Sequence, residues 1–266
     1  MSEEKPTGRV NPTPDPRYSR SMEYAVAILE CFSAEHRQRG IADLADLVGI
    51  SRSTVHRYAI TLVALGYLEQ DTKRKYRLSM GAANPGAAAI SAVRRRAPGR
   101  VALQELRDAT GYTVSMGVLD RARVIYVYRL FGHRGGQCAI DQDLGVGASL
   151  PLYCTALGKV LLASVSEGER RELLETLDLV PYGPRSITDK DKLAAELDRI
   201  SLRDAVISDE EFVHGARSIA VFVPQPRGEY PLAIDMTVPS SAYTVARLAE
   251  EIGPVLKRTA RLIAGD

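Results

Sequence analysis

The sequence has few cysteines and no long apolar run. Its 266 residues include three cysteines, which are Cys31, Cys138 and Cys154. An odd, scattered set argues against a disulfide framework and favours a reducing cytoplasm. No stretch approaches the roughly 18 apolar residues of a membrane-spanning helix. The polar, proline-rich residues 1–18 lack the apolar segment of a secretory signal. We therefore expect a cytoplasmic protein without a membrane partner, beginning with a disordered tail at 1–18.

The chain also lacks the spacings that mark metal and cofactor sites. Its four histidines show no ligand spacing such as HExxH. Gly145 and Gly147 lack the third glycine of a dinucleotide fingerprint. Gly158-Lys159 lacks the first glycine and the Ser or Thr of a P-loop. We therefore expect no metal, no cofactor and no catalytic residue.

The net charge is positive in the first part of the chain and negative in the second part. Residues 1–100 hold 16 Lys+Arg and 10 Asp+Glu, a net charge of +6, whereas residues 101–266 hold 19 and 23, a net charge of −4. The two values sum to the +2 of the whole chain. A basic first part joined to an acidic second part fits a nucleic-acid-binding module followed by a domain that does not touch nucleic acid.

Residues 41–65 have the spacing of a helix-turn-helix motif. Ala45 is small enough to let two helices approach closely, and Gly49, four residues later, suits a tight turn because glycine tolerates positive φ. Ser51 can cap the second helix by accepting a free backbone N–H. The apolar positions of the motif are filled by Leu44, Val48, Ile50, Val55 and Tyr58. Such a motif presents its second helix to the DNA major groove.

This second helix, expected from about Arg52 to Leu65, has an apolar face toward the core and a polar face away from it. Arginine can form two hydrogen bonds to guanine, and serine can bind base edges or phosphates. We predict DNA contacts for Ser51, Arg52, Ser53, Thr54, His56 and Arg57. The alternative is a helical hairpin inside an ordinary α domain.

A β-hairpin wing is expected directly after this helix. Gly66 would end the helix, and two short strands would flank a polar turn at 71–75. The hairpin would direct four basic residues toward phosphates, Lys73, Arg74, Lys75 and Arg77. A charge run of this kind is otherwise just a solvated turn. An amphipathic helix over 21–32 would support the motif from the other side.

The remainder of the chain mixes helices and strands. Pro85 and Pro98 bound a linker helix over 87–96, whose cluster Arg94, Arg95 and Arg96 could face DNA, an acidic partner surface or solvent. Further helices are predicted over 101–110, 155–165, 167–177, 189–203 and 243–264. Strands are predicted over 112–119, 123–130, 137–141, 206–208, 218–223 and 232–237. This order predicts an α+β fold. Its domains would be a winged helix-turn-helix at 19–80, a linker helix at 81–100 and a C-terminal domain at 101–266.

Six segments, in order along the chain, carry a resemblance to a known family. They are RSMEYAVAILECFS, LVALGYLEQD, VIYVYRL, LPLYCTALGKVLLAS, DEEFVHGARSIAVFV and LAIDMTVPSS. From about residue 19 to residue 263 the chain resembles the isocitrate lyase regulator (IclR) family of bacterial transcription factors. The resemblance implies that the C-terminal domain is a GAF-like effector-binding domain. It also implies a homodimer or tetramer on a partly palindromic double-stranded DNA operator.

The resemblance further implies a pocket for a small-molecule effector on one face of the C-terminal sheet, closed by residues 150–164. Free N–H groups at a helix start there can bind a carboxylate. The implied effector-binding residues are Tyr153, Cys154, Thr155, Ala156, Gly158, Asp209, Ser218, Asp235 and Thr237. Many relatives carry cysteine at the position of Ser218. A serine at this position resembles the branch of the family that regulates aromatic-acid and β-ketoadipate catabolism. Asp235 argues the other way, since an acid facing the pocket would disfavour an anionic effector.

We therefore predict a DNA-binding transcriptional regulator that responds to a small catabolite, an organic or aromatic acid. The alternative is a small-molecule enzyme or binding protein with a vestigial DNA-binding module. In that alternative, Cys154 would be a nucleophile with His133 or His214 as its base. A lone, partly buried cysteine more often serves packing than chemistry. The effector, the operator and the choice between dimer and tetramer stay open in the sequence.

Overall fold

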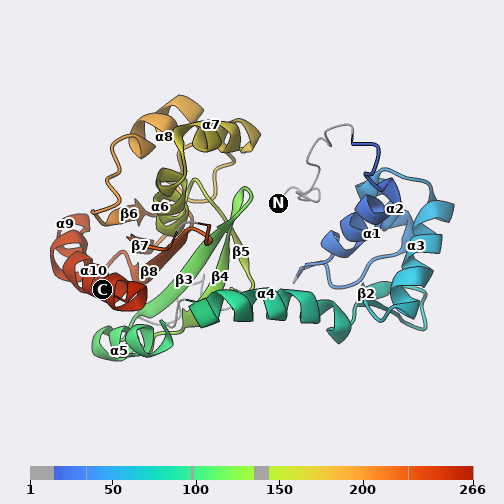
Figure 1. Ribbon diagram of the computed structural model, residues 1–266, viewed down its shortest axis with the longest axis horizontal. Coiled ribbons are helices and arrows are strands. Elements are labelled where there is room, and N and C mark those ends of the chain that lie inside the picture. The colour runs from blue at the N-terminus through green and yellow to red at the C-terminus, as the bar shows by residue number, and fades with distance from the viewer. Residues whose placement is uncertain (1–14, 34, 97–98, 135–143, 227, 266) are drawn as a thin grey trace. The chain divides into compact units, whose positions relative to one another are not determined.

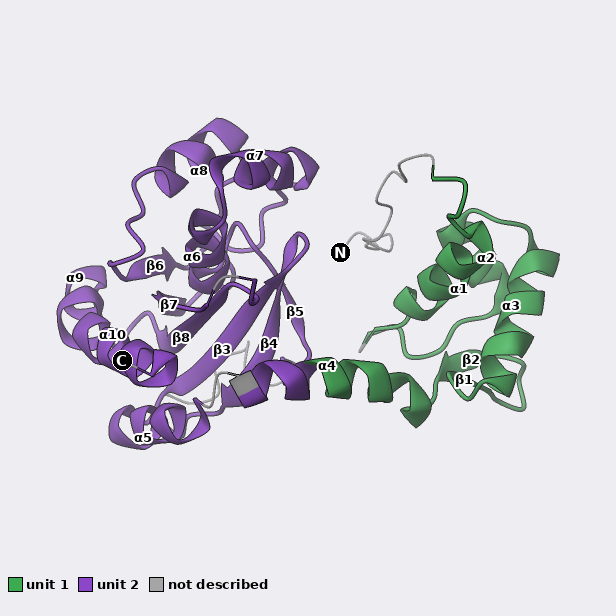
Figure 2. Ribbon diagram, viewed as in Figure 1, with its two compact units in different colours: residues 1–89 green, residues 90–266 purple. Residues whose placement is uncertain are grey.

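The computed structural model describes residues 15–33, 35–96, 99–134, 144–226 and 228–265 (Figure 1). The chain divides into two compact units, residues 1–89 and residues 90–266 (Figure 2). The division falls inside helix α4 (Ala83–Arg96), within the segment predicted as a linker.

The first unit is built on three helices, α1 (Arg20–Glu30), α2 (Ile41–Val48) and α3 (Arg52–Ala64). Gly49 ends α2 with a φ of 75°, the left-handed conformation that glycine adopts at low cost. Ser51 then caps α3, because its hydroxyl accepts the backbone N–H of Thr54. The predicted helix-turn-helix and its turn chemistry are confirmed.

A two-stranded hairpin follows α3 and forms the predicted wing. Strand β1 (Leu68–Gln70) pairs antiparallel with β2 (Tyr76–Leu78). Across the turn, the Asp71 carboxylate accepts two backbone N–H groups at 2.9 and 2.8 Å. Tyr76 also forms a β-bridge with Arg39, which ties the wing to the segment before α2.

Helix α4 begins earlier than the predicted start at residue 87. A short 3-10 turn, η1 (Met80–Ala82), leads directly into α4 at Ala83. Pro85 therefore lies in the first turn of the helix. Its missing N–H costs no intrahelical hydrogen bond there, so proline is compatible with the longer helix.

The second unit contains a six-stranded antiparallel sheet in the order β5-β4-β3-β8-β7-β6 (Figure 1). Its strands are β3 (Thr113–Asp120), β4 (Arg123–Leu130), β5 (Ser149–Pro151), β6 (Val206–Asp209), β7 (Ala216–Val223) and β8 (Leu232–Pro239). The short edge strand β5 was not predicted, because it ends in a proline and shows its strand character only by pairing with β4. The predicted strand at 137–141 lies outside the described residues.

Helices cover both faces of this sheet (Figure 1). One face packs against α5 (Arg100–Thr110) and α10 (Gly253–Ala264). The opposite face packs against α6 (Ala156–Ser164), with α7 (Glu167–Thr176) and α8 (Lys190–Leu197) beyond it. In the described part of the chain, no helix combines the length and the apolar content needed to span a membrane. The result is the predicted α+β fold.

Two further helices differ from their predicted extents. Helix α8 ends at Leu197, and the Ser201 hydroxyl then accepts the Arg203 N–H in a local turn that competes with helix. The predicted helix over 243–264 is α9 (Val245–Arg247), a π-helical turn η2 (Leu248–Ile252) and α10. Pro254 explains the interruption, because it cannot donate the hydrogen bond that a continuous helix needs.

Candidate DNA-binding surface and effector site

The residues predicted to contact DNA from α3 fall into two groups. The hydroxyls of Ser51 and Thr54 lie 2.8 Å apart at the helix start, so both take part in capping. Arg52, Ser53, His56 and Arg57 are exposed, as Ser51 is, and the Ser53 hydroxyl also lies 2.9 Å from that of Ser51. The guanidinium of Arg57 lies 5.5 Å from the centre of the Tyr58 ring, a distance at which the ring face attracts a cation. The exposed face of α3 therefore carries two arginines.

The wing carries a second basic group. Lys73, Arg74 and Lys75 are exposed in its turn, where they form a continuous positive segment. Arg77 differs from these three because its guanidinium binds the Glu69 carboxylate of the neighbouring strand at 2.7 Å. Arg77 thus has an acidic partner within the hairpin, and its contact with phosphates stays a prediction.

In the second unit, the sheet face beneath α6 carries a row of four hydroxyl side chains. The strand register pairs Ser208 with Ser218, Ser218 with Thr237, and Thr237 with Thr113. Paired positions on neighbouring strands place side chains side by side on one face. The row therefore crosses β6, β7, β8 and β3, and it includes the predicted effector residues Ser218 and Thr237.

A second polar row lies next to the first on the same face. The register pairs Asp235 with Ser115 and Ser115 with Arg129. These three side chains are almost fully buried, at 4%, 0% and 6% exposure. Asp235 was predicted, whereas Ser115 and Arg129 were not. Arg129 was missed because a break in the strand alternation of β4 turns it to this face.

Arg129 sets the electrostatics of the second row. Its Nη1 donates to the Ser115 hydroxyl at 3.1 Å, and its guanidinium lies 4.7 Å from the centre of the Tyr126 ring. Burial raises the pKa of Tyr126, the Asp235 carboxylate raises it further, and the Arg129 cation opposes both. The acid at position 235 therefore has a cation in the same cluster, which offsets its negative charge.

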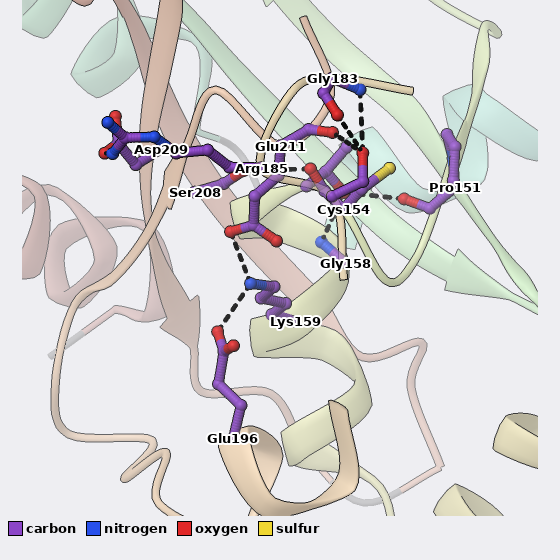
Figure 3. Close-up of polar contacts among 12 residues, drawn as sticks. Pro151, Cys154, Gly158, Lys159, Gly183, Arg185, Glu196, Ser208, Asp209 and Glu211 are labelled. Carbon is purple, nitrogen blue, oxygen red and sulfur yellow. Dashed lines mark hydrogen bonds and ion pairs between the residues drawn. The ribbon is translucent and has the colours of Figure 1, made fainter. Parts of the chain in front are cut away.

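The predicted loop and helix start at 153–158 lie next to Ser208, the β6 member of the first row (Figure 3). The Ser208 hydroxyl donates to the Cys154 carbonyl at 3.0 Å, joining the loop to the first row. Thr155 caps α6 by accepting the Gly158 N–H at 3.1 Å. The predicted loop residues are all buried, namely Tyr153, Cys154, Thr155, Ala156 and Gly158. The helix start is thereby fixed above the sheet, with its remaining N–H groups at Ala156 and Leu157.

Lys159, one residue further along α6, is a buried cation between two carboxylates (Figure 3). It is 1% exposed, and its Nζ lies 2.6 Å from Glu196 Oε1 and 2.6 Å from Glu211 Oε1. The ion pairs connect α6 to α8 and to the β6–β7 connection. Local spacing does not predict these ion pairs, because the partners are 37 and 52 residues away in the chain.

Comparisons with known proteins identify the family. The C-terminal domain profile of the bacterial transcriptional regulator IclR matches residues 87–264, and the IclR helix-turn-helix domain profile matches residues 21–72. The chain belongs to the IclR family of bacterial transcriptional regulators. The Pca regulon regulatory protein of Pseudomonas putida is 28% identical, over 94% of this chain and 84% of that protein.

Solved structures of the IclR family have the same fold. An IclR family transcriptional regulator from Brucella abortus is 26% identical, with a TM-score of 0.80 over 98% of this chain and 97% of that one. An IclR homologue from Microbacterium hydrocarbonoxydans, solved in complex with 4-hydroxybenzoate, is 22% identical, with a TM-score of 0.72 over 92% and 98% of the two chains.

Within this IclR-family chain, the structure separates Asp209 from the other predicted effector residues. Strand alternation turns Ser208 toward α6 and Asp209 toward the opposite face. The Asp209 carboxylate binds the guanidinium groups of Arg185 and Arg217. Asp209 therefore lies on the opposite face from the polar rows, whereas Ser208, which was not among the predicted residues, belongs to the first row.

Cys154 has the environment of a packing residue in this regulator. Its side chain is fully buried, and burial together with the nearby Glu211 carboxylate raises its pKa to about 12. A thiol with this pKa stays protonated at neutral pH and is a poor nucleophile. The two histidines considered as its base, His133 and His214, are exposed. Among the described residues, no group of His, Cys, Asp and Glu side chains has an arrangement that could hold a metal ion.

Proposed function

We propose that a small organic or aromatic acid binds between the start of α6 and the sheet, and that its binding changes how this regulator binds its operator. The two polar rows carry the proposal. Hydroxyl, carboxylate and guanidinium groups gathered beneath a helix start offer donors and acceptors that suit a polar ligand. The set comprises Ser208, Ser218, Thr237, Thr113, Asp235, Ser115 and Arg129, with the loop residues Tyr153, Cys154, Thr155, Ala156 and Gly158 above them.

The chemistry of the rows supports an acid that also carries a hydroxyl group. Arg129 supplies a cation, and the start of α6 supplies N–H groups toward which a carboxylate is attracted. Asp235 and the hydroxyl row supply acceptors for a ligand hydroxyl. The bound 4-hydroxybenzoate of the Microbacterium homologue has both groups.

The DNA-binding part of the proposal rests on the exposed basic residues of the first unit. The polar face of α3 would read bases in the major groove, and the wing would bind phosphates. A homodimer or a tetramer in the cytoplasm, bound to a partly palindromic duplex, fits a helix-turn-helix reader of this type. The high pKa of the buried Cys154 argues against the alternative in which this thiol is a catalytic nucleophile.

Thermal stability of the full chain tests the ligand class. The probes are 4-hydroxybenzoate and its neutral analogue 4-hydroxybenzamide, followed by other aromatic and aliphatic acids. An acid at about 100 times its Kd should stabilise the chain by about 2.7 kcal/mol, and the amide should not. Ser218→Ala should reduce this shift, and the exposed Ser91→Ala should keep it. Equal stabilisation by the acid and the amide, or a full shift in the Ser218 variant, would contradict the proposed site.

Fluorescence anisotropy tests the DNA-binding residues, on a duplex selected from a random library by the unmodified chain. Arg52→Ala and Arg57→Ala should each weaken binding by about 1 to 3 kcal/mol if they contact bases. Arg199→Ala removes the same charge from an exposed site in the second unit and is the matched control. Unchanged affinity in both α3 variants would overturn their assignment.

A further inference from the structure

Arg94 of helix α4 contacts the sheet and does not extend into solvent. Its Nε donates to the backbone carbonyl of Val127 in β4 at 2.6 Å, and its guanidinium lies 4.5 Å from the centre of the Tyr128 ring. Ile90 and Val93 of the same helix pack against the core on that side of the sheet. The hydrogen bond is charge-assisted, and such bonds are roughly twice as strong as neutral ones.

The carbonyl that Arg94 binds belongs to a β-bulge. Met116 pairs with Tyr128, but the next residue, Gly117, pairs with Tyr126, so Val127 has no partner in the β3–β4 register. A bulge leaves one residue outside the ladder and bends the strand locally. Arg94 therefore binds β4 at the residue that has no partner in β3.

The residues at this bulge also contact both faces of the sheet. Tyr126 and Val127 are adjacent and both are buried, but Tyr126 packs on the α6 side and Val127 on the opposite side. On the α6 side, the Arg129 guanidinium lies over the Tyr126 ring. One peptide segment thus has the proposed effector site on one face and the linker helix on the other.

We propose that Arg94 couples the effector site to the linker helix through this bulge. The inference rests on the proposed function, since it assigns a regulatory path to the same site. A ligand that moves Arg129 or Tyr126 would shift the Val127 peptide, and the hydrogen bond from Arg94 would carry that shift into α4. The same helix continues to Ala83, inside the DNA-binding unit. Arg94 is a positioning residue, because it touches neither DNA nor the effector.

Amide hydrogen exchange of the ligand-free full chain, measured as a double-mutant cycle, tests the coupling. Arg129→Ala perturbs the effector face, with Ser115→Ala as a milder second change. In the chain with Arg94 intact, either change should alter exchange in α4 by about fivefold or more, the lower end of ordinary allosteric coupling. In the Arg94→Met background, which keeps the apolar stem and removes the donor, α4 should no longer respond.

The neighbouring Arg95→Met is the matched control. The Arg95 side chain is exposed and makes no hydrogen bond or ion pair with the rest of the described chain, so the response of α4 should persist in its background. Arg94→Lys, which keeps the charge, should retain part of the response. An equal response of α4 with and without Arg94 would overturn the proposal, as would no response in the Arg94-intact chain. Because the cycle uses no ligand, failure of every acid in the thermal screen would contradict the proposed function and leave this result intact.

Discussion

Lys159 is a charged residue that water barely reaches. Removing an ammonium group from water costs several kcal/mol, which only close carboxylate partners offset. Glu211 and Glu196 supply them, each at 2.6 Å. Glu211 is itself buried, and its second oxygen, Oε2, has no hydrogen-bond partner within the described structure. The stability of this cluster therefore depends on Lys159 staying in place.

We expect Lys159→Met to destabilise the chain by about 3 to 5 kcal/mol, because it leaves the buried Glu211 carboxylate without its cation. Urea-induced unfolding followed by circular dichroism measures the loss. The double variant Lys159→Met/Glu211→Met should recover most of it, since both charges are then gone. A loss under about 1 kcal/mol in the single variant would mean that the ion pairs contribute little.

Glu211 should also make stability depend on pH. Burial raises the pKa of Glu211 above its ordinary value near 4.5, although Lys159 opposes the shift. The folded state then holds the Glu211 proton more tightly than the unfolded state. The resulting stabilisation is present below about pH 4.5 and is lost as the pH rises through the folded-state pKa.

Unfolding measured from pH 4.5 to 8 in the wild-type chain and in Glu211→Gln isolates this contribution. The difference in unfolding free energy between the two should move in favour of the variant as the pH rises. The exposed Glu175→Gln is the control, for which we expect no such trend. A wild-type and a Glu211 variant with parallel pH profiles would contradict the shift.

At the scale of the element, the start of α6 depends on a residue without a side chain. A Cβ at Gly158 would overlap the backbone carbonyl of Leu152, so the helix start and the preceding loop approach closely only because residue 158 is glycine. This contact positions the Thr155 cap and the Cys154 carbonyl over the polar rows.

We expect Gly158→Ala to destabilise the chain and to abolish acid binding, because the loop must move away from the helix. Gly168→Ala is the matched control, since that glycine lies in the exposed helix α7 with open space around it. It should stabilise by about 0.5 to 1 kcal/mol through helix propensity alone. Melting temperatures of both variants, with and without 4-hydroxybenzoate, give the comparison. Equal melting temperatures would contradict the close packing at Gly158.

The elements that sequence predicts well are those defined by local spacing. The helix-turn-helix follows from Ala45, Gly49 and Ser51, which act within one short segment. The polar rows depend on the pairing of strands far apart in the chain, so only the residues carried over by family resemblance were foreseen. Arg129 was not predicted as a site residue, because a bulge at Val127 breaks the two-residue alternation on which strand prediction relies.

At the scale of the whole molecule, the uneven charge does not follow the division of the structure. Residues 1–89 hold 12 Lys+Arg and 10 Asp+Glu, and residues 90–266 hold 23 of each, because Arg94, Arg95, Arg96 and Arg100 belong to the second unit. The positive charge that could meet DNA therefore lies locally, on the exposed face of α3 and on the wing. A basic module binds DNA electrostatically, with an affinity that falls steeply as salt increases. Ligand control then requires only that an effector change the free energy of DNA binding by about 1 to 3 kcal/mol.

The most direct test of this account is the affinity of the full chain for its selected duplex, measured at fixed salt with and without the acid that stabilises it best. We expect the acid to change the Kd for DNA by about fivefold or more. The change should be lost in Ser218→Ala and kept in Ser91→Ala. An unchanged Kd with saturating acid, or a change that survives the loss of the Ser218 hydroxyl, would contradict an effector site on the α6 face of the sheet.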